Sequence, residues 1–263
     1  MKRHLRLFLL YLAQYTKVRL AYKADFIIAF FSSMAATVLG FGFVLVLFSK
    51  IPKLQDWSFY EILFLYGFSL IPLGFFNVVS WNLYEFGDIY IIQGRFDRIL
   101  LRPVDTLFQV IFEKFRLESL QEVATGTLVI WICVRHLGLD WGPFDCLWFA
   151  LMVVCGAVIY LSVFLILTAV SFWFEDRVGI VPPVFNMLTF ARYPLTIYSV
   201  FIQFMLSWII PFGFASFYPT THFLGRKTFT PYFHLVPVVA ATFFVLSIFV
   251  WNRGVRNYSS TGS

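Results

Sequence analysis

Residues 26–48, FIIAFFSSMAATVLGFGFVLVLF, form a stretch of 23 residues without a charged side chain, and 14 of them are Leu, Ile, Val or Phe. A transmembrane helix needs about 20 predominantly apolar residues to cross a hydrocarbon core roughly 30 Å thick. At roughly 0.3–0.6 kcal/mol each, these large apolar residues favour insertion by about 4–8 kcal/mol before the polar residues are subtracted. The stretch therefore predicts a membrane-spanning helix.

The whole chain has the composition of a membrane protein. Of its 263 residues, 60% are hydrophobic and 13% are charged, whereas soluble domains carry about 25% charged residues. Further apolar stretches predict spanning helices at residues 59–83, 117–136, 146–174 and 234–251. Glu175, Asp176 and Arg177 are expected to close the helix that begins at residue 146. We expect an all-α, polytopic membrane protein that forms one domain over residues 1–263.

Residues 178–225 are harder to assign. Their 48 residues carry a single charge, Arg192, and are interrupted by five prolines. They are too long for one crossing, and two crossings would place the basic C-terminal tail on the side opposite the N-terminus. One span plus a re-entrant hairpin fits both the length and the basic tail, provided that protein shields the broken backbone. Hydropathy alone selects residues 195–217 as the span, which gives six spans in total.

The N-terminal residues 1–23 combine basic side chains with a short apolar run, as a signal peptide does. Lys17, Arg19 and Lys23 follow this run at once, and no small-residue cleavage site is present. We therefore expect a retained amphipathic helix on the cytoplasmic interface, with Phe8 and Tyr15 on its apolar face.

The distribution of Lys and Arg predicts the orientation in the membrane. With six spans and both termini inside, 14 basic residues lie on the inner side and five on the outer side, and Arg192 stays unassigned. Basic residues gather in cytoplasmic loops. Both termini and residues 85–106 are accordingly expected in the cytoplasm.

Motifs for catalysis are absent from the sequence. Residues 225–228, GRKT, lack the upstream glycine and the strand-to-helix context of a phosphate-binding loop. The four histidines are scattered, and Cys133, Cys146 and Cys155 lack metal-ligand spacing. The net charge of +6 is not gathered on a polar module of the kind that binds nucleic acid. We expect no catalytic residue, no metal, no cofactor and no nucleic-acid partner, with membrane lipid around the chain.

Residues 85–106, EFGDIYIIQGRFDRILLRPVDT, are too long for a turn and too charged to cross a membrane. Apolar side chains such as Ile99 are interspersed with charged ones such as Arg98, which predicts a short amphipathic helix. Gly94 permits a tight bend, and the residue before Pro103 avoids helical geometry. Two interpretations stay open at this point: a helix that receives force from a cytosolic partner, and an interfacial helix that merely returns to the membrane.

Two motifs resemble those of a bacterial type-2 ABC exporter permease family. Residues 94–104, GRFDRILLRPV, resemble that family's loop pattern G-x-x-D-x-x-L-L-R-P-V. Residues 253–262, RGVRNYSSTG, are similar to its C-terminal pattern R-G-x-x-x-Y-x-S-x-G. The pairs Tyr-Pro, Ile-Pro and Tyr-Pro that end at Pro194, Pro211 and Pro219 resemble its proline-marked hairpin. The match runs from the basic N-terminus to the tail.

The resemblance implies a six-span permease of the bacterial inner membrane that exports a substrate as one of a pair. The second permease would be a related paralogue or a copy of this chain. Each permease would bind a cytosolic ABC ATPase, and that partner would bind ATP and Mg. The resemblance places Gly94, Asp97, Arg102 and Pro103 in the coupling loop that docks on the ATPase.

The resemblance also implies a different assignment of the proline-rich region. The fifth span would come first, at about 177–192. Residues 193–224, with Pro194, Pro211 and Pro219, would then form a re-entrant gate on the outer side.

Carboxylates and amides near the membrane are candidates for a substrate path. Glu118 and Glu122 lie one helical turn apart, and only 12 charge-free residues follow before Arg135. Carboxylates at such a depth are costly and often mark a substrate or ion path. The alternative is a headgroup-level position, with Lys114 paired to Glu118. Asn77 and Asn82 face the same choice between joining helices and lining a path.

Two other functional classes compete with the permease. An ion-coupled secondary transporter would have ionisable residues near mid-membrane, often within inverted repeats, and neither is visible in the sequence. A membrane scaffold without transport activity leaves the motif at residues 94–104 unexplained. The sequence therefore favours the transport subunit.

Overall fold

The computed structural model describes residues 2–174 and 179–259, and the regular elements in this part of the chain are all helices. Five helical segments are long and apolar enough to cross a membrane, as expected for an integral membrane protein. Their main helices are α2 (Lys23–Lys50), α3 (Phe59–Tyr84), α6 (Leu120–His136), α7 (Pro143–Ala169) and α13 (Thr230–Asn257). Each coincides with a stretch that the sequence predicts, and the all-α polytopic fold is confirmed.

Helix α3 forms the centre of the molecule, whereas α2 lies on its outside. The most apolar window of α3 is 78% buried, against 11% for α2. Helix α3 packs against both α6 and α7, and α13 packs against α7. Small residues allow this close packing, as is usual between membrane helices. A Cβ atom added to Gly126 of α6 would lie 2.6 Å from the carbonyl oxygen of Gly67 in α3.

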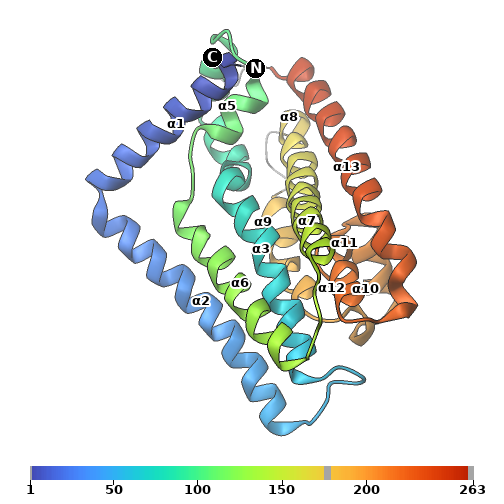
Figure 1. Ribbon diagram of the computed structural model, residues 1–263. Helices are drawn as coiled ribbons and strands as arrows, with labels where there is room; N and C mark the ends of the chain where they lie inside the picture. The colour runs from blue at the N-terminus through green and yellow to red at the C-terminus, as the bar shows by residue number, and fades with distance from the viewer. Residues whose placement is uncertain (1, 175–178, 260–263) are drawn as a thin grey trace.

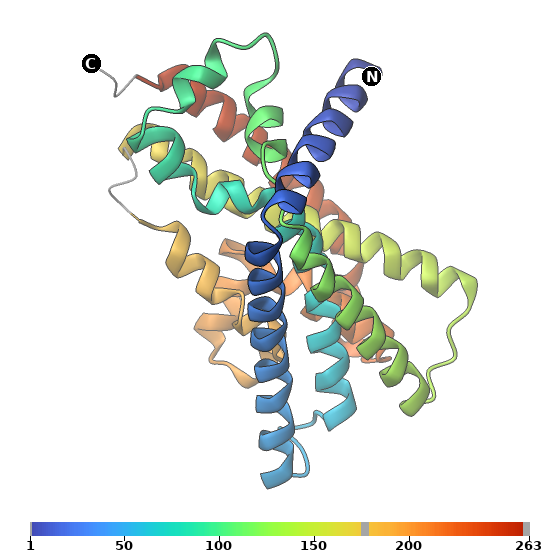
Figure 2. The ribbon, with the colours of Figure 1, turned by 90° about the vertical axis from the view of Figure 1, so that its left-hand side faces the viewer.

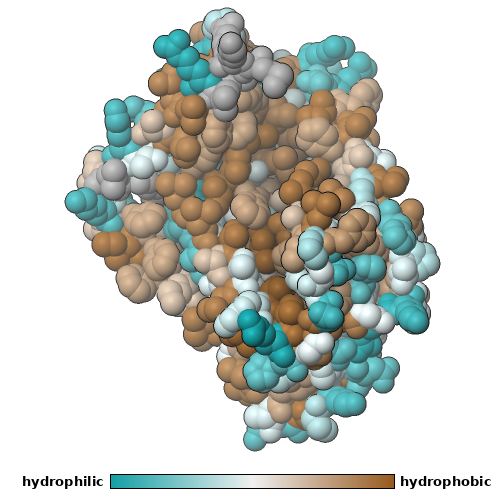
Figure 3. All heavy atoms as spheres, in the orientation of Figure 1, coloured by the Kyte–Doolittle hydropathy of each residue, from teal (hydrophilic) through white to brown (hydrophobic). Residues whose placement is uncertain are grey.

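The first two helices form an arm along one side of the bundle. Helix α1 (Lys2–Ala21) meets α2 at a sharp angle, and the start of α1 lies at the same end of the molecule as the end of α13 (Figure 1). Figure 2 shows α2 running down the outer face, with α6 on one side of it and α9 (Val181–Met187) on the other. Figure 3 shows apolar side chains over much of the middle of the molecule.

At the end of the molecule that holds α1's start, short helices connect the spans. The sequence predicts a loop that begins at residue 85, but the helix of α3 continues as the π-helix η1 (Gly87–Ile92). It continues because Phe86, Tyr90 and Ile91 are buried in the core. After η1 come α4 (Phe96–Leu100), α5 (Thr106–Phe112) and η2 (Leu117–Ser119), and α8 (Ser171–Phe174) follows α7. The expected charged closure at residues 175–177 lies outside the described residues.

The proline-rich region contains no continuous spanning helix in its described part. Its elements after α9 are η3 (Phe190–Arg192), η4 (Leu195–Ile197), α10 (Val200–Phe204), η5 (Met205–Ile209), α11 (Phe212–Ala215), α12 (Phe217–Phe223) and η6 (Lys227–Phe229). The stretches Val200–Ile209 and Phe212–Phe223 together have the length of a span but are bent by 72°. This geometry fits a broken span or a re-entrant loop. Neither expected fifth span, at 177–192 or at 195–217, is one straight helix.

Candidate functional site

Gly94 separates η1 from α4 at the end of the molecule where α1 begins. Its φ of +66° lies in the left-handed region, which glycine adopts without a steric penalty. Its amide donates a hydrogen bond to the carbonyl of Ile91 over 3.1 Å, which closes the preceding helix. The tight bend expected at Gly94 is therefore present, and it turns α4 back across the ends of the spans.

A cluster of aromatic rings holds α4 against the spans. The ring of Phe96 in α4 lies 5.0 Å from that of Phe172 in α8 and 5.8 Å from that of Phe86, which lies between α3 and η1. Trp251 of α13 stacks edge-on against Phe86 at 5.3 Å and against Phe172 at 5.2 Å. These four rings are almost fully buried. The cluster therefore joins α4 to the ends of the helical segments that contain α3, α8 and α13.

Polar contacts fix the remaining parts of the loop. Asp97 accepts a hydrogen bond from the Tyr258 hydroxyl over 3.0 Å, which ties α4 to the tail after α13. The buried amide of Gln109 donates to the carbonyls of Ile99 and Val104, at 3.2 and 2.9 Å. Gln109 thus holds both ends of the stretch between α4 and α5.

The other face of the α4 turn is open. The side chain of Leu101 is 85% exposed, and Arg98, Arg102 and Pro103 are exposed as well. The Val104 amide donates to the carbonyl of Arg102 over 2.8 Å, so the chain turns tightly at this point. Within the described part of the chain, the Arg102 guanidinium has no ion-pair partner. It is free to bind a group outside this chain.

A polar cavity of about 360 Å³ lies between α2, α3, α6 and α9. Its lining residues are Ser32, Ser33, Ala36, Thr37, Leu73, Asn77, Trp81, Arg116, Glu122, Phe185, Asn186, Leu188, Thr189 and Arg192. Leu73, Asn77 and Trp81 repeat every four residues, which places them on one face of α3. The cavity is therefore lined by residues of α2, α3, α6 and the segment that begins with α9. Figure 2 shows α6 and α9 on either side of α2.

Two of the expected path residues meet in this cavity. The Asn77 amide donates a hydrogen bond to one carboxylate oxygen of Glu122 over 2.9 Å. The Ser33 hydroxyl lies 3.5 Å from the other oxygen. The Asn77 carbonyl oxygen is buried and has no hydrogen-bond partner in the described chain. The Glu122 carboxylate is thus held by neutral donors from α2 and α3.

Two arginines also line the cavity. The Arg116 guanidinium lies over the Trp81 ring at 4.0 Å, and its Nε is 3.5 Å from a Glu118 oxygen. The Arg192 guanidinium lies over the Tyr66 ring at 5.4 Å and donates to the Tyr66 hydroxyl over 3.2 Å. Such stacking on aromatic faces stabilises a cation that has little water around it.

The other two expected path residues lie away from the cavity lining. Asn82 is buried and donates to the Val110 carbonyl over 2.8 Å, so it joins α3 to α5. Glu118 is only 3% exposed and meets Arg116, while Lys114 lies 3.3 Å from Glu85. Asn77 and Glu122 are therefore brought together, and Asn82 and Glu118 are not part of that surface.

The three prolines expected in the gate occupy different positions. Pro194 precedes η4, and Pro211 lies at the 72° break between η5 and α11. Pro219 lies in the first turn of α12, where its missing amide hydrogen breaks no helical hydrogen bond. Only Pro211 coincides with the sharp bend.

A latch of four side chains joins this region to the loop between α2 and α3. The Arg226 guanidinium lies 3.8 Å above the Trp57 ring and donates twice to one oxygen of Glu61, at 2.8 and 3.2 Å. The Trp57 indole donates to the Thr196 hydroxyl over 3.0 Å. Thr196 lies in η4, so the latch fixes the beginning and the end of the region that follows α9.

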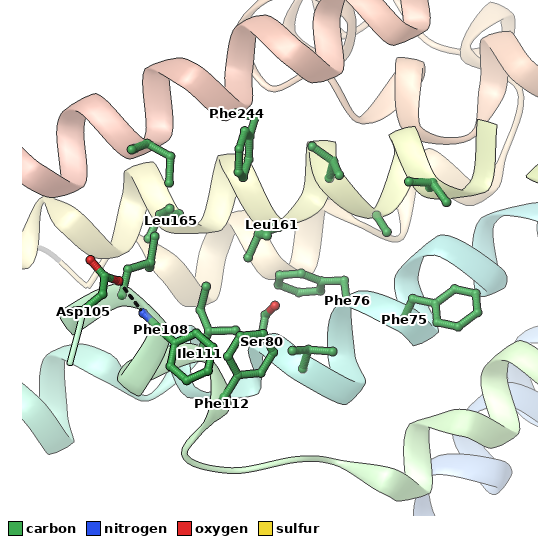
Figure 4. A pocket seen from close by; sticks show the side chains of 16 residues that line it. Phe75, Phe76, Ser80, Asp105, Phe108, Ile111, Phe112, Leu161, Leu165 and Phe244 are labelled. Carbon is green, nitrogen blue, oxygen red and sulfur yellow. Dashed lines mark hydrogen bonds between the residues drawn. The ribbon is translucent and has the colours of Figure 1, made fainter. Parts of the chain in front are cut away.

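An apolar groove of about 550 Å³ lies on the other side of α3. Figure 4 shows Phe76 of α3, Ile111 of α5, Leu161 of α7 and Phe244 of α13 around it. The Asp105 carboxylate stands at one end and accepts from the Phe108 amide over 2.8 Å, which caps α5. Ser80 of α3 is the other polar side chain among the residues that line the groove.

Comparison with protein families decides the class of the chain. A family model described as ABC-2 family transporter protein matches residues 31–262, which include both the α4 loop and the beginning of the tail. The chain belongs to this family. No curated protein and no solved structure matches it. Membership of the ABC-2 family makes the chain a membrane component of a transporter.

The sequence alone did not identify every residue that the ABC-2 chain brings to these sites. Arg192 stood out as the one charge in an apolar stretch, but its partner Tyr66 lies 126 residues away. Tyr258 belongs to the tail motif, yet nothing in the sequence pairs it with Asp97. Arg116 looked like an ordinary basic residue beside a span. The cavity was therefore predictable in part, through Asn77 and Glu122.

Proposed function

We propose that this ABC-2 chain is the permease subunit of an ATP-driven exporter in the inner membrane of a bacterium. In this account both termini and α4 lie in the cytoplasm, and the substrate moves outward. A cytosolic ABC ATPase binds ATP and Mg and docks on α4. The permease works as a pair with a second permease subunit, either a copy of this chain or a related one.

The observation that carries the proposal is the two-sided character of α4. Its inner side presents Phe96 to a buried aromatic cluster that includes α3, α8 and α13. On its outer side Arg98 is exposed, and the turn that follows α4 presents the exposed Leu101 and the unpaired Arg102. A guanidinium can form a bidentate bond to a partner carboxylate. A cytosolic partner bound there would move the ends of the spans together.

The loop residues have separate parts in this proposal. Arg102 binds the ATPase, while Pro103 and Gly94 fix the path of the chain on either side of α4. Asp97 holds the loop to the tail through Tyr258. Asn77 and Glu122 line the route of the substrate, and residues 193–224 gate its outer end through the bend at Pro211.

The test is the energy source of transport. The purified chain alone should hydrolyse no ATP, because the sequence has no phosphate-binding loop. Reconstituted with a co-expressed ABC ATPase, it should export substrate from vesicles when ATP is supplied without an ion gradient. Transport driven by a proton or sodium gradient in the absence of ATP would contradict the proposal and would favour the ion-coupled secondary transporter.

A further inference from the structure

Arg192 is a cation inside the membrane domain that makes no ion pair with the described part of the chain. It is the only charge among residues 178–225. No carboxylate in the described chain lies within ion-pair distance of its guanidinium, and its buried Nε has no acceptor there. A charged side chain at such a position is costly unless a partner compensates it. The hydrogen-bond partner of its guanidinium on the described chain is the neutral Tyr66 hydroxyl, and the Glu122 carboxylate of the same cavity attracts it from beyond ion-pair distance.

The approach of Tyr66 to α2 depends on Gly40. A Cβ atom added to Gly40 would lie 1.8 Å from the Tyr66 hydroxyl oxygen, so only glycine fits there. The Tyr66 side chain is held in place by this contact and by the Phe41 ring, 4.6 Å away. The position of Arg192 at the wall of the cavity is thus set by α2 and α3 as well as by its own segment.

Two guanidinium groups and one carboxylate are among the described lining residues of the cavity, and the buried Asn77 carbonyl oxygen is an acceptor without a partner there. Arg116 brings a second guanidinium, which stacks on Trp81. The Glu122 carboxylate is the one acidic side chain among the lining residues, and the neutral donors of Asn77 and Ser33 already approach its two oxygens. A bound cation would have to compete with those donors. A bound oxyanion would find the guanidinium-bearing side chains of Arg192 and Arg116 among the lining residues.

The walls and the opening of the cavity suit the apolar chain of an amphipathic molecule whose head group is bound inside. Leu73, Phe185 and Leu188 supply apolar surface beside the polar groups. Its volume of about 360 Å³ lies within the usual range for small-ligand sites. Ala36, at the rim on α2, is exposed, and α2 presents a largely apolar outer surface. A head group can therefore enter the cavity while its chain stays among lipid tails.

We propose that this cavity binds the oxyanion head group, a phosphate or carboxylate, of an amphipathic molecule, with Arg192 and Arg116 as its ligands. The proposal rests on the proposed function in one respect, because it names the substrate class of the exporter. The binding itself requires neither the ATPase nor transport.

The experiment measures binding of radiolabelled dodecyl phosphate to the full chain in phosphatidylcholine nanodiscs, with empty nanodiscs subtracted. Unlabelled inorganic phosphate and dodecyltrimethylammonium serve as competitors. We expect the radiolabelled dodecyl phosphate to bind saturably. Unlabelled dodecyl phosphate should displace it at a concentration about tenfold lower, or less, than either competitor requires. Equal displacement by inorganic phosphate would reduce the site to one for free anions. Tighter binding of the ammonium would assign the cavity to cations. Either result would overturn the proposal.

Two variants and a matched control locate the binding. Arg192→Gln should weaken dodecyl phosphate binding about tenfold or more, because a hydrogen bond to a charged group is lost. Arg135→Gln is the control, since its guanidinium also stacks on an aromatic ring, Trp131, at 5.4 Å but lies outside the cavity. Ala36→Trp should block the cavity while it leaves both arginines intact.

The outcomes separate this inference from the proposed function. If Arg192→Gln fails to fold, Ala36→Trp still decides the question. Binding that is unchanged in Ala36→Trp, or weakened equally by Arg135→Gln, would place the ligand elsewhere. Because the ATPase is absent from the assay, a failure of coupling at Arg102 would leave this result untouched.

Discussion

The Tyr258 hydroxyl donates a hydrogen bond to a carboxylate oxygen of Asp97 over 3.0 Å, across 161 residues of sequence. This bond joins the two motifs of the chain, the loop at 94–104 and the tail that begins at Arg253. Burial raises the pKa of Tyr258 to about 12, and its bond to Asp97 acts in the same direction. The hydroxyl therefore stays protonated and keeps donating at physiological pH.

Tyr258→Phe should loosen α4 while the spans stay intact. It removes one hydrogen bond to a charged acceptor and leaves the ring, which packs 4.9 Å from Phe96. We expect faster amide hydrogen exchange in residues 96–104 and a loss of stability of about 1 kcal/mol. Tyr22→Phe, at an exposed tyrosine, is the control and should change neither quantity. Unchanged exchange in Tyr258→Phe would show that the bond does not hold the loop.

Gly254→Ala should destabilise the protein, because the tail motif needs glycine for close packing. A Cβ atom at Gly254 would lie 2.5 Å from the Phe172 ring. Overpacking of this kind costs about 1–3 kcal/mol. The same change at Gly42, where nothing lies within 4 Å, should be neutral or slightly stabilising. Thermal unfolding of the two variants in one detergent makes the comparison, and equal unfolding temperatures would contradict the packing argument.

The two asparagines of α3 should behave differently when replaced by alanine. Asn82→Ala removes the bond to the Val110 carbonyl and should lower stability by about 1–3 kcal/mol without changing ligand binding. Asn77→Ala removes a donor from Glu122 and should also change binding in the cavity. The nanodisc assay and thermal unfolding, applied to both variants, separate the two effects. Loss of ligand binding in Asn82→Ala at unchanged stability would show that Asn82 belongs to the binding site and does not merely join α3 to α5.

The pair Arg226 and Glu61 should show energetic coupling across the latch. Two N–H groups of one guanidinium reach the same oxygen, but the side chains are still 24% and 19% exposed. We expect a coupling energy on the order of 1 kcal/mol in a double-mutant cycle with alanine. Lys227→Ala, at the exposed neighbour, should show no coupling to Glu61→Ala. A coupling energy below about 0.3 kcal/mol would show that the Arg226–Glu61 pair contributes nothing to stability.

The spanning helices were predictable because lipid imposes one strong requirement on them. Residues 26–48 and 59–83 are apolar over the length of a bilayer, and both became helices of that length. The same requirement fails at residues 178–225, because prolines break the helix while protein contacts shield the backbone. A hydropathy profile depends on local sequence alone and contains no information on that shielding. It therefore selected a straight span at 195–217, where the structure has a 72° bend.

The sites were less predictable because their contacts link distant residues. The helical segment that begins with α3 continues through η1 beyond the expected boundary at residue 85, because Phe86 packs against Trp251, a contact that exists only in the folded chain. Asn77 and Glu122 were each suspected from their polar character within or beside a span. Their hydrogen bond joins positions 45 residues apart, which no local pattern specifies. Arg102 could be selected from its motif, but its exposure had to be observed.

The orientation of the chain can be tested by single-cysteine labelling. The background must lack Cys146, which is exposed, and the buried Cys133 and Cys155 should also be replaced. In intact cells an impermeant reagent should label Gln55→Cys between α2 and α3 but not Gly94→Cys beside α4. Labelling of position 94 and not of position 55 would show that the chain has the opposite orientation in the membrane.

The most direct test of the account is the coupling of Arg102 to the ATPase. Arg102→Glu should fold normally, because its side chain is exposed and unpaired in the described chain. Lys53→Glu, an exposed charge reversal in the loop between α2 and α3, is the matched control. The measurement is recovery of the ATPase complex and ATP-driven transport, each per folded permease. The account predicts that Arg102→Glu lowers both severalfold while Lys53→Glu changes neither; normal recovery and transport in a well-folded Arg102→Glu variant would contradict it.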